Sequence, residues 1–366
     1  MLSPFARSLI DADGDDTINN HWKPIRKLTP NLLDKTTYTC HYRNLQFYVD
    51  QGLKITKMHR ILAFKQESWL KPWIDYCTAR RMQATTEFES DLAKLMANAT
   101  FGKSLENVRN RQNIRLIVDK NKLTKAESRT TFRQSEIINE DLVLVKAARR
   151  QVTLNKPISV GFAVLELSKL IMYEFFYCHL KSRYGDRCSL LFSDTDWLSC
   201  HIQTDDLYAD MATDIDSYDT INFDRDHALY STANHRVLGK IESETGSVEP
   251  KEFVGLRAKM YSLSVPGNER HNKIRVKGVK RPYVRKNVRH EQFMDMLTNL
   301  KPTSSRFRSF ASRQHTVRTV EIRKSCLNAF DDKRYLLPDG VHTLAYGHRD
   351  IPDQTTTVAA AAVAYH

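Results

Sequence analysis

The sequence contains no paired cysteines of the kind that bind zinc or build disulfide frameworks. Its six cysteines are scattered through 366 residues, and no Cys-x-x-Cys pair occurs. Such spacing supports neither a zinc site nor a set of structural disulfides. We therefore expect free thiols and a reducing compartment.

Long apolar runs are also missing. No stretch approaches the roughly 18 apolar residues that would cross a bilayer, and the opening MLSPFARSLIDADGDD lacks the apolar core of a signal peptide. Glycine is scarce, with 12 residues, whereas 41% of the chain is hydrophobic and 10% is aromatic. This composition predicts a folded protein. The missing apolar runs predict an intracellular one without a membrane partner.

Acidic residues are under-represented in the last third of the chain. The net charge is +13, and residues 253–366 contain 21 Lys and Arg against 9 Asp and Glu. The first 252 residues are nearly neutral. A folded, basic and aromatic-containing segment suits contact with a phosphate backbone. A solvated basic surface without a partner would have the same composition.

The N-terminal half shows several periodic segments. Residues 1–20 have no periodicity, and residues 41–65 alternate apolar and polar side chains around a glycine, which predicts a hairpin. Residues 69–108 predict two helices, the second opening at Thr85 or Thr86 with acidic residues in its first turn. Residues 119–133 are polar and predict a surface connection.

An apolar helix is predicted from Gly161 to near Tyr184, and strands are predicted at 188–192 and 197–202. Between those strands lies Phe192-Ser-Asp194-Thr-Asp196-Trp197. Asp-x-Asp occurs five times in the chain, but only this copy has an apolar strand on both sides. Rigidly held carboxylates bind the divalent ions of phosphoryl transfer, and burying them without a cation would be costly. We therefore predict that Asp194 and Asp196 are metal ligands.

A second pattern lies about ninety residues earlier, in Lys94-Leu-Met-Ala-Asn98-Ala-Thr-Phe101-Gly102. Its Lys, Asn, Phe and Gly have helical spacing and share one face. On spacing alone, an amphipathic helix with an ordinary surface lysine explains this pattern better than a binding site does.

Taken together, the two patterns resemble motifs B and C of family B DNA polymerases, particularly the protein-primed viral and organellar branch and its Maverick/Polinton-like relatives. The resemblance covers about residues 22–350. It implies an α+β, right-hand architecture with an antiparallel palm sheet, helical fingers and a basic thumb, incomplete at the N-terminus. Motif A, an Asp-x-x-Ser-Leu-Tyr-Pro run, and the proofreading exonuclease have no counterpart in the sequence. The chain therefore resembles the C-terminal portion of such an enzyme.

The resemblance also implies roles for particular residues. Asp194 and Asp196 would hold part of a two-magnesium site, and Lys94 would contact the incoming deoxynucleoside triphosphate and act in catalysis. Further nucleotide contacts would come from Asn98, Phe101, Gly102 and Arg81. Gly255-Leu-Arg-Ala-Lys259-Met-Tyr261 resembles the Lys-x-Tyr motif that holds a primer terminus. Two residues apart on a strand, its Lys and Tyr would face the same side. The remaining DNA contacts would be Lys277, Lys280, Arg281, Arg285 and Lys286.

In family order, the resemblance divides the chain into an N-terminal start at 1–21, a palm insertion at 22–65, fingers at 66–118, palm at 119–252 and thumb at 253–366. The expected partners of a monomer are primer–template DNA and, in the protein-primed branch, a terminal priming protein. A nuclear location would suit a product of an integrated element. This sequence has Phe192 for the motif's Tyr and Trp197 for its Ser, which favours an alternative, a DNA-binding remnant without catalysis. A metal-dependent nuclease would use the same aspartates without needing Lys94.

Overall fold

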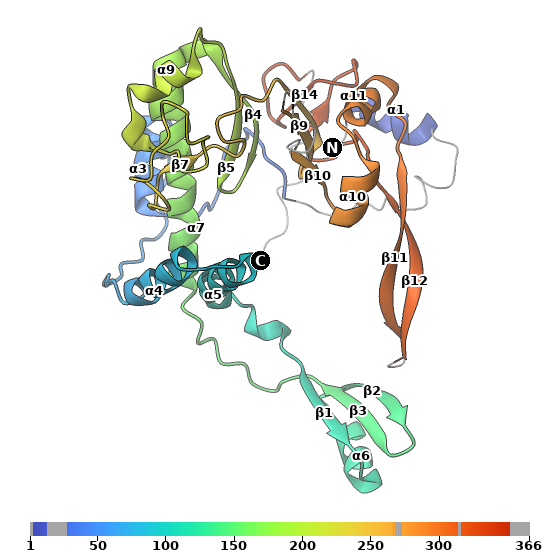
Figure 1. The fold of residues 1–366 in the computed structure, drawn as a ribbon. Coiled ribbons are helices and arrows are strands. Elements are labelled where there is room, and N and C mark those ends of the chain that lie inside the picture. Colours follow the sequence, from blue (N-terminus) through green and yellow to red (C-terminus); the bar gives the residue numbers. More distant parts are fainter. Residues whose placement is uncertain (1–2, 13–27, 266, 268–272, 314–315, 352–366) are drawn as a thin grey trace. The chain divides into compact units, whose positions relative to one another are not determined.

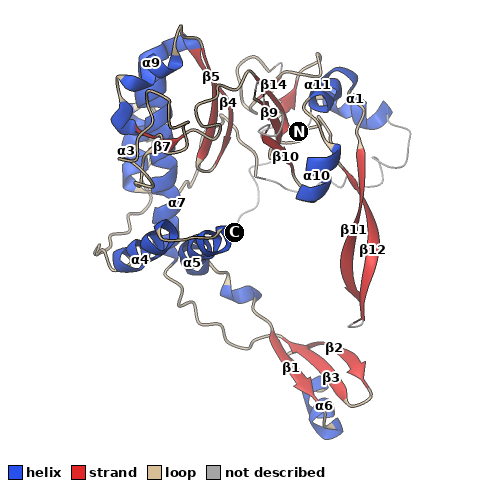
Figure 2. Cartoon of the chain, in the orientation of Figure 1, coloured by secondary structure: helices blue, strands red, loops and turns tan. Residues whose placement is uncertain are grey.

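The chain forms a mixed α+β structure in a computed structural model that describes residues 3–12, 28–265, 267, 273–313 and 316–351 (Figures 1 and 2). Packing divides it into two units. The first comprises Met1–Thr36, Leu180–Phe310 and Thr319–His366, and the second comprises Thr37–His179 and Ala311–Arg318. No helix among the described residues is long and apolar enough to span a bilayer.

Among its described residues, the first unit contains short helices and five small strand sets, one of which is the parallel pair β6–β7. The hairpin of β4 and β5 and the sheet β10–β9–β8 carry the candidate site. The elements are α1 (Pro4–Ala12), α8 (Lys181–Tyr184), β4 (Cys188–Asp194), β5 (Trp197–Ile202), α9 (Leu207–Ala212), β6 (Tyr218–Asp219), β7 (Ile241–Glu242), β8 (Glu252–Arg257), β9 (Met260–Ser264), β10 (Lys273–Val276), α10 (Arg281–Asn287), α11 (Glu291–Asn299), β11 (Ser304–Arg313), β12 (Thr316–Ser325), β13 (Tyr335–Leu336) and β14 (Thr343–Leu344). The tip of the β11–β12 hairpin falls in the second unit.

The second unit is built from helices and one three-stranded sheet of order β1–β3–β2. Its elements are α3 (Tyr42–Asp50), α4 (Lys71–Met82), α5 (Glu87–Ser104), β1 (Asn113–Ile117), α6 (Lys120–Glu127), β2 (Phe132–Asn139), β3 (Leu142–Ala147), α7 (Ile158–Tyr173) and the π-helical continuation Glu174–Leu180, whose last residue opens the first unit's middle segment.

The core of the first unit lies between the sheet β10–β9–β8 and the helices α10 and α11. Met260 and Phe293 are fully buried there, and Met296 and Leu327 are nearly so. Strand alternation places Val254, Leu256 and Met260 on this inner side. The sheet is therefore fixed from behind by apolar packing, which leaves its other side and its turns available for polar chemistry.

The two helices predicted at 69–108 are confirmed as α4 and α5. Pro72 lies in the first turn of α4, where its missing N–H is tolerated. Thr86 caps α5, its hydroxyl accepting from the Glu89 backbone N–H at 3.2 Å, while the Glu89 carboxylate accepts from Thr85. These reciprocal bonds satisfy N–H groups that the helix itself cannot pair.

The hairpin predicted at 41–65 is wrong, because Tyr42–Asp50 forms helix α3 and residues 53–68 have no regular structure. Asn44 and Phe47 lie three residues apart and both face α7. The Asn44 amide donates to the Glu166 carbonyl at 2.8 Å, and the Phe47 ring stacks on Tyr173 at 6.3 Å. Tertiary packing on α7 thus overrides the strand preference of the aromatic residues.

The surface connection predicted at 119–133 is also wrong. This segment contains α6 and the start of β2, which pairs with β3 in the three-stranded sheet. Asp119 caps α6 by accepting from the Lys122 N–H at 2.8 Å. The polar composition reflects a small exposed module with few buried side chains. At the N-terminus, Pro4–Ala12 is helical instead of irregular, and the acidic run that follows lies outside the described residues.

The apolar helix predicted from Gly161 is confirmed as α7, its π-helical continuation and α8, which ends at Gly185 with φ 55°. Gly161 lies where α7 crosses α5. A Cβ atom at this position would come within 2.4 Å of both the Leu105 side chain and the Ser104 hydroxyl. The close approach of the two helices therefore depends on the absence of a side chain.

Replacing Gly161 with Ala should lower the free energy of unfolding by about 1–3 kcal/mol, because the methyl group overpacks the α5–α7 crossing. Gly102→Ala is the matched control, since Gly102 also lies in a helix and has open space where its Cβ would be. That control should raise stability by about 1 kcal/mol through helix propensity. Urea denaturation measures both, and equal effects of the two substitutions would contradict the crossing argument.

Candidate active site

The predicted acidic turn closes the β4–β5 hairpin. Asp194 pairs with Trp197, and Thr195 and Asp196 form the two-residue connection, with the Asp196 N–H donating to the Asp194 carbonyl at 2.8 Å. Thr195 has φ 59°, a conformation that costs a β-branched residue about 1–3 kcal/mol. The turn holds this strain while fixing the spacing of the two carboxylates.

The two aspartates are less buried than we predicted from the apolar strands on either side of them. Asp196 is exposed, and the side chain of Asp194 retains 32% of its accessible surface. The claim that buried carboxylates require a cation is therefore wrong for this turn. Asp194 nevertheless has a cationic partner, because the Lys259 Nζ lies 3.1 Å from its Oδ2.

Lys259 comes from the turn between β8 and β9, not from a strand as the Lys-x-Tyr spacing suggested. Arg257 pairs with Met260, so Ala258 and Lys259 form a two-residue turn in which Lys259 has φ 61°. Tyr261 is the second residue of β9. The two motif residues thus reach the β4–β5 hairpin from different backbone settings.

Four aromatic rings pack behind the acidic turn. Tyr261 stacks on Trp197 with centroids 5.0 Å apart and planes 18° apart, and it lies 4.8 Å from the Phe192 ring. Phe253 completes the group at 6.0 Å from Tyr261 and 6.2 Å from Phe192. Phe192 and Trp197, the two residues that depart from the motif which this turn resembles, both belong to the cluster. Their apolar rings here serve to join the two hairpins.

Substituting Trp197 with Ser, the residue typical of the motif, should lower the free energy of unfolding by about 1–3 kcal/mol, because Tyr261 loses its stacking partner. Trp197→Phe should cost less, since a ring remains. Thermal unfolding monitored by circular dichroism compares the two. A serine variant as stable as the parent would show that the stack contributes nothing to joining the hairpins.

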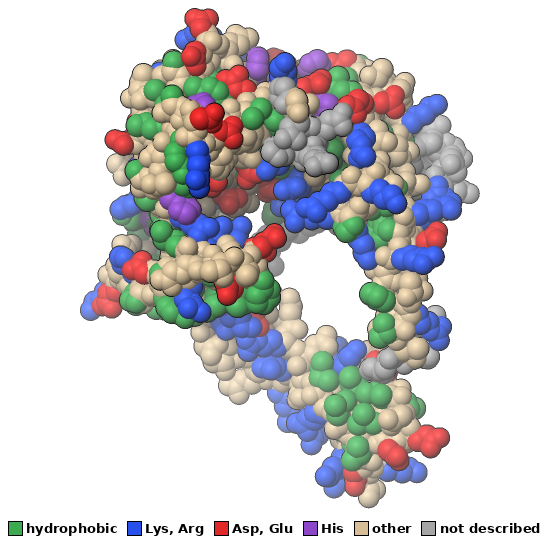
Figure 3. Space-filling view, viewed as in Figure 1, with side chains coloured by type: hydrophobic (Ala, Val, Ile, Leu, Met, Phe, Trp, Pro, Cys, Tyr) green, Lys and Arg blue, Asp and Glu red, His purple; other side chains and the backbone are tan. Residues whose placement is uncertain are grey.

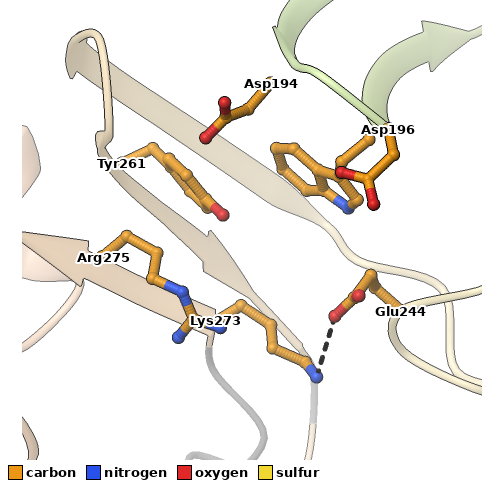
Figure 4. Close-up of a pocket in the computed structure, with 7 residues that line it drawn as sticks. Asp194, Asp196, Glu244, Tyr261, Lys273 and Arg275 are labelled. Carbon is orange, nitrogen blue, oxygen red and sulfur yellow. Dashed lines mark ion pairs between the residues drawn. The ribbon is translucent and has the colours of Figure 1, made fainter. Parts of the chain in front are cut away.

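Asp194, Asp196 and Trp197 line a pocket together with Tyr261 and three residues that sequence reasoning missed, Glu244, Lys273 and Arg275. Figure 4 shows the aspartates entering from the β4–β5 turn and Tyr261 and Arg275 from the neighbouring sheet. Lys273 and Glu244 form an ion pair at 3.2 Å. Burial raises the pKa of the Tyr261 hydroxyl, and Arg275 opposes that rise. No motif surrounds Glu244 or Arg275, so only the fold reveals them.

The Asp210 carboxylate forms hydrogen bonds with residues on both sides of the β4–β5 hairpin. Asp210 accepts hydrogen bonds from the Tyr184 hydroxyl at 3.0 Å, from the Thr204 hydroxyl at 2.6 Å and from the Arg183 guanidinium at 2.8 Å. Tyr184 and Arg183 precede β4, and Thr204 follows β5. These donors, led by Thr204, hold the pKa of Asp210 below its usual range despite partial burial. The network fixes the base of the β4–β5 hairpin, and it thereby helps to position the acidic turn at the hairpin's other end.

Asp210→Asn should reduce stability at neutral pH by about 1–2 kcal/mol, because three donors lose a charged acceptor. The lowered pKa means that the carboxylate's contribution is present above its unfolded pKa and is lost as pH falls toward the folded pKa. The gap between variant and parent should therefore close below about pH 4. Denaturation at several pH values measures it, and a gap independent of pH would exclude the carboxylate's charge as its source.

The predicted nucleotide contacts all lie in the second unit, on α4 and α5. Lys94, Asn98 and Gly102 are exposed along α5, Phe101 is half-buried, and Arg81 is half-buried near the end of α4. The shared helix face is confirmed. Whether this face meets the aspartates of the first unit stays a prediction.

The predicted DNA contacts of the basic third lie in and around α10. Lys277, Arg281, Arg285 and Lys286 are exposed, whereas Val284 packs inward against the core. Lys280 is also exposed, yet its Nζ donates to the Arg308 carbonyl at 2.8 Å and lies 5.6 Å from the Phe307 ring centroid. Lys280 therefore fastens α10 to β11 in addition to contributing charge.

The donor set at the acidic turn suits a magnesium ion that keeps most of its waters. Mg²⁺ is commonly bound through one or two carboxylates plus substrate phosphates, and Asp194 and Asp196 supply that number. Among the described residues, no group of three or more His, Cys, Asp and Glu side chains is arranged to hold a metal. The six cysteines are all free thiols, as predicted.

Comparisons of the chain with protein-family models, with curated proteins and with solved structures each found no match.

Proposed function

We propose that the chain binds primer–template DNA and carries the motif B and motif C part of a family B DNA polymerase, which adds deoxynucleotides to a primer with magnesium. One observation carries this proposal. The Lys259–Tyr261 segment, about 65 residues after the acidic turn in sequence, contacts that turn through an ion pair to Asp194 and a stack on Trp197. The segment that resembles the Lys-x-Tyr motif and the turn that resembles motif C are thus in direct contact, although they are far apart in the sequence.

In the proposed reaction, a divalent metal at Asp194 and Asp196 would activate the primer 3′ oxygen and neutralise charge on the phosphates. The chain's own residues position the reactants. The strained turn keeps the two carboxylates at a fixed spacing, and the aromatic cluster holds that turn against the β8–β9 hairpin. Tyr261 and Arg275 offer a hydroxyl and a guanidinium to the same pocket, where they would contact a terminal sugar and phosphate.

The second unit would supply the nucleotide contacts. On α5, Lys94 is exposed and Asn98 lies one turn further along the same face. An ammonium group there would neutralise the triphosphate and the leaving pyrophosphate. Gly102 has open space around it, which would let a base or sugar approach the backbone closely.

The basic surface of the first unit would hold the duplex. Figure 3 shows Lys and Arg side chains gathered over α10, and the exposed residues of this helix include Arg281, Arg285 and Lys286. Such a surface binds phosphates without reading sequence, so binding should weaken steeply as salt rises. The resemblance leaves the motif A aspartate unassigned.

A second candidate function, DNA binding without catalysis, is favoured by the state of the carboxylates. Asp194 is paired with a lysine, and only one further aspartate is beside it in the turn. In that function Lys94 would have no ligand, which separates the two candidates experimentally.

Lys94→Ala should weaken binding of a fluorescent deoxyadenosine triphosphate to the chain–primer–template complex about 10- to 100-fold, since a charge-assisted contact is lost. Lys103→Ala, an exposed lysine of the same helix paired with Glu106, should leave that affinity unchanged. Fluorescence anisotropy in Mg²⁺ measures both. Equal nucleotide affinities with DNA still bound would support the non-catalytic alternative.

Primer extension with Mg²⁺ and all four deoxynucleotides completes the experiment, with Asp194→Asn as its control. Extension that the control abolishes would show that the chain's own carboxylates complete the metal site. Nucleotide binding without extension would show that the site binds substrate but lacks the motif A ligand. If the parent chain bound neither nucleotide nor DNA, the proposed function would be rejected.

A further inference from the structure

Lys259 occupies a backbone position that ordinarily belongs to glycine. It is the second residue of the β8–β9 turn, and its φ of 61° lies in the left-handed region that favours residues without a Cβ. A lysine there is strained. Its side chain is more than half exposed, and it forms an ion pair.

That contact is with the carboxylate expected to bind metal. The Lys259 ammonium lies 3.1 Å from Asp194 Oδ2, and the Asp194 side chain is one-third exposed. Asp196, two residues away, is exposed. The ammonium thus takes the place that a cation would take at one of the two carboxylates, and a metal ion at Asp194 would repel it at close range.

We propose that Lys259 and a divalent cation compete for Asp194, so that metal binding releases Lys259 to engage a phosphate of bound DNA. The inference rests on the proposed function and adds an exchange of charge partners to it. With the metal absent, the lysine neutralises Asp194 and is withheld from DNA. With the metal present, the strained turn presents a free ammonium beside the site where the primer terminus would lie.

The exchange couples metal binding to DNA binding. Whatever factor the metal contributes to DNA affinity through Lys259, DNA must contribute equally to metal affinity. The ion pair is partly exposed, and exposed pairs are weak, so we expect a factor of about two- to five-fold. The sign is informative. Magnesium at constant ionic strength ordinarily competes with basic side chains for phosphates and weakens DNA binding, whereas the exchange strengthens it.

The first experiment measures metal binding alone. Tb³⁺ bound at Asp194 and Asp196 would be sensitised by the neighbouring Trp197, and Mg²⁺ would displace it. Lys259→Gly should tighten Mg²⁺ about two- to five-fold, and its melting temperature should be no lower than that of the parent because glycine accepts the turn conformation. Lys301→Ala is the control and should leave metal binding unchanged, since it removes an exposed lysine that does not line the pocket. Unchanged or weaker metal binding in Lys259→Gly would overturn the competition.

The second experiment measures primer–template affinity with and without Mg²⁺ at constant ionic strength. In the parent chain, Mg²⁺ should strengthen binding about two- to five-fold, and Asp194→Asn should do the same without metal by releasing the lysine. When Lys259→Gly is also present, the gain from Mg²⁺ should be lost, and the gain from Asp194→Asn should fall to that of Asp196→Asn. Asp196→Asn also removes one acidic charge from the turn but breaks no pair with Lys259, so its effect should be the same in both backgrounds.

The outcomes separate the inference from the function beneath it. Metal and DNA binding that are both present but show no coupling through Lys259 would overturn the exchange and leave the proposed function standing. An equal gain from Asp194→Asn with and without Lys259 would also overturn it, because simple loss of repulsion would then suffice. A chain that binds neither Tb³⁺ at the aspartates nor DNA would reject both.

Discussion

The candidate site depends on the contact between two hairpin turns. One turn carries Asp194 and Asp196, and the other carries Lys259. They are joined by an ion pair on the solvent side and by stacked rings behind it. The ion pair is weak because it is partly exposed, so the rings of Trp197 and Tyr261 supply most of the attachment. Charge can therefore be exchanged at this contact without the two turns coming apart.

Both turns are strained, and each is supported from a different direction. Thr195 and Lys259 have positive φ angles that favour glycine, and such conformations persist only where the surroundings determine them. The β4–β5 turn is supported at its base by the hydrogen bonds to Asp210, and the β8–β9 turn is supported by the buried Met260 and the apolar core beneath it. Rigid support of this kind is what a site for charged substrates requires.

The sequence predicted those parts of the fold where local signals and packing agree. The Thr86 cap of α5 and the apolar run of α7 were read correctly from the sequence. So were the two apolar strands on either side of the acidic turn, which form β4 and β5. It was wrong at residues 41–65, where aromatic residues favour a strand locally but pack as a helix on α7. It was also wrong at residues 119–133, where polar composition hides a small sheet with one helix.

The candidate site was predictable to a similar extent. The aspartates, Lys259 and Tyr261 were identified from short motifs, and the structure brings these four together. Glu244, Lys273 and Arg275 could not be predicted as pocket residues. Their positions depend on the pairing register of the sheet and on the course of a loop, and neither can be inferred from a local sequence pattern. The role of Trp197 was also missed. From the sequence alone, its departure from the motif suggested a loss of catalytic function, and only the structure shows that it stacks on Tyr261.

The crossing of α5 and α7 has a consequence for how this protein can vary. Gly161 leaves no room for a methyl group because Ser104 and Leu105 fill the space. A larger residue at 161 would be accepted only if 104 and 105 became smaller or moved. These three positions should therefore change together among relatives, and a sequence in which they do so would preserve the orientation of the helix that carries Lys94.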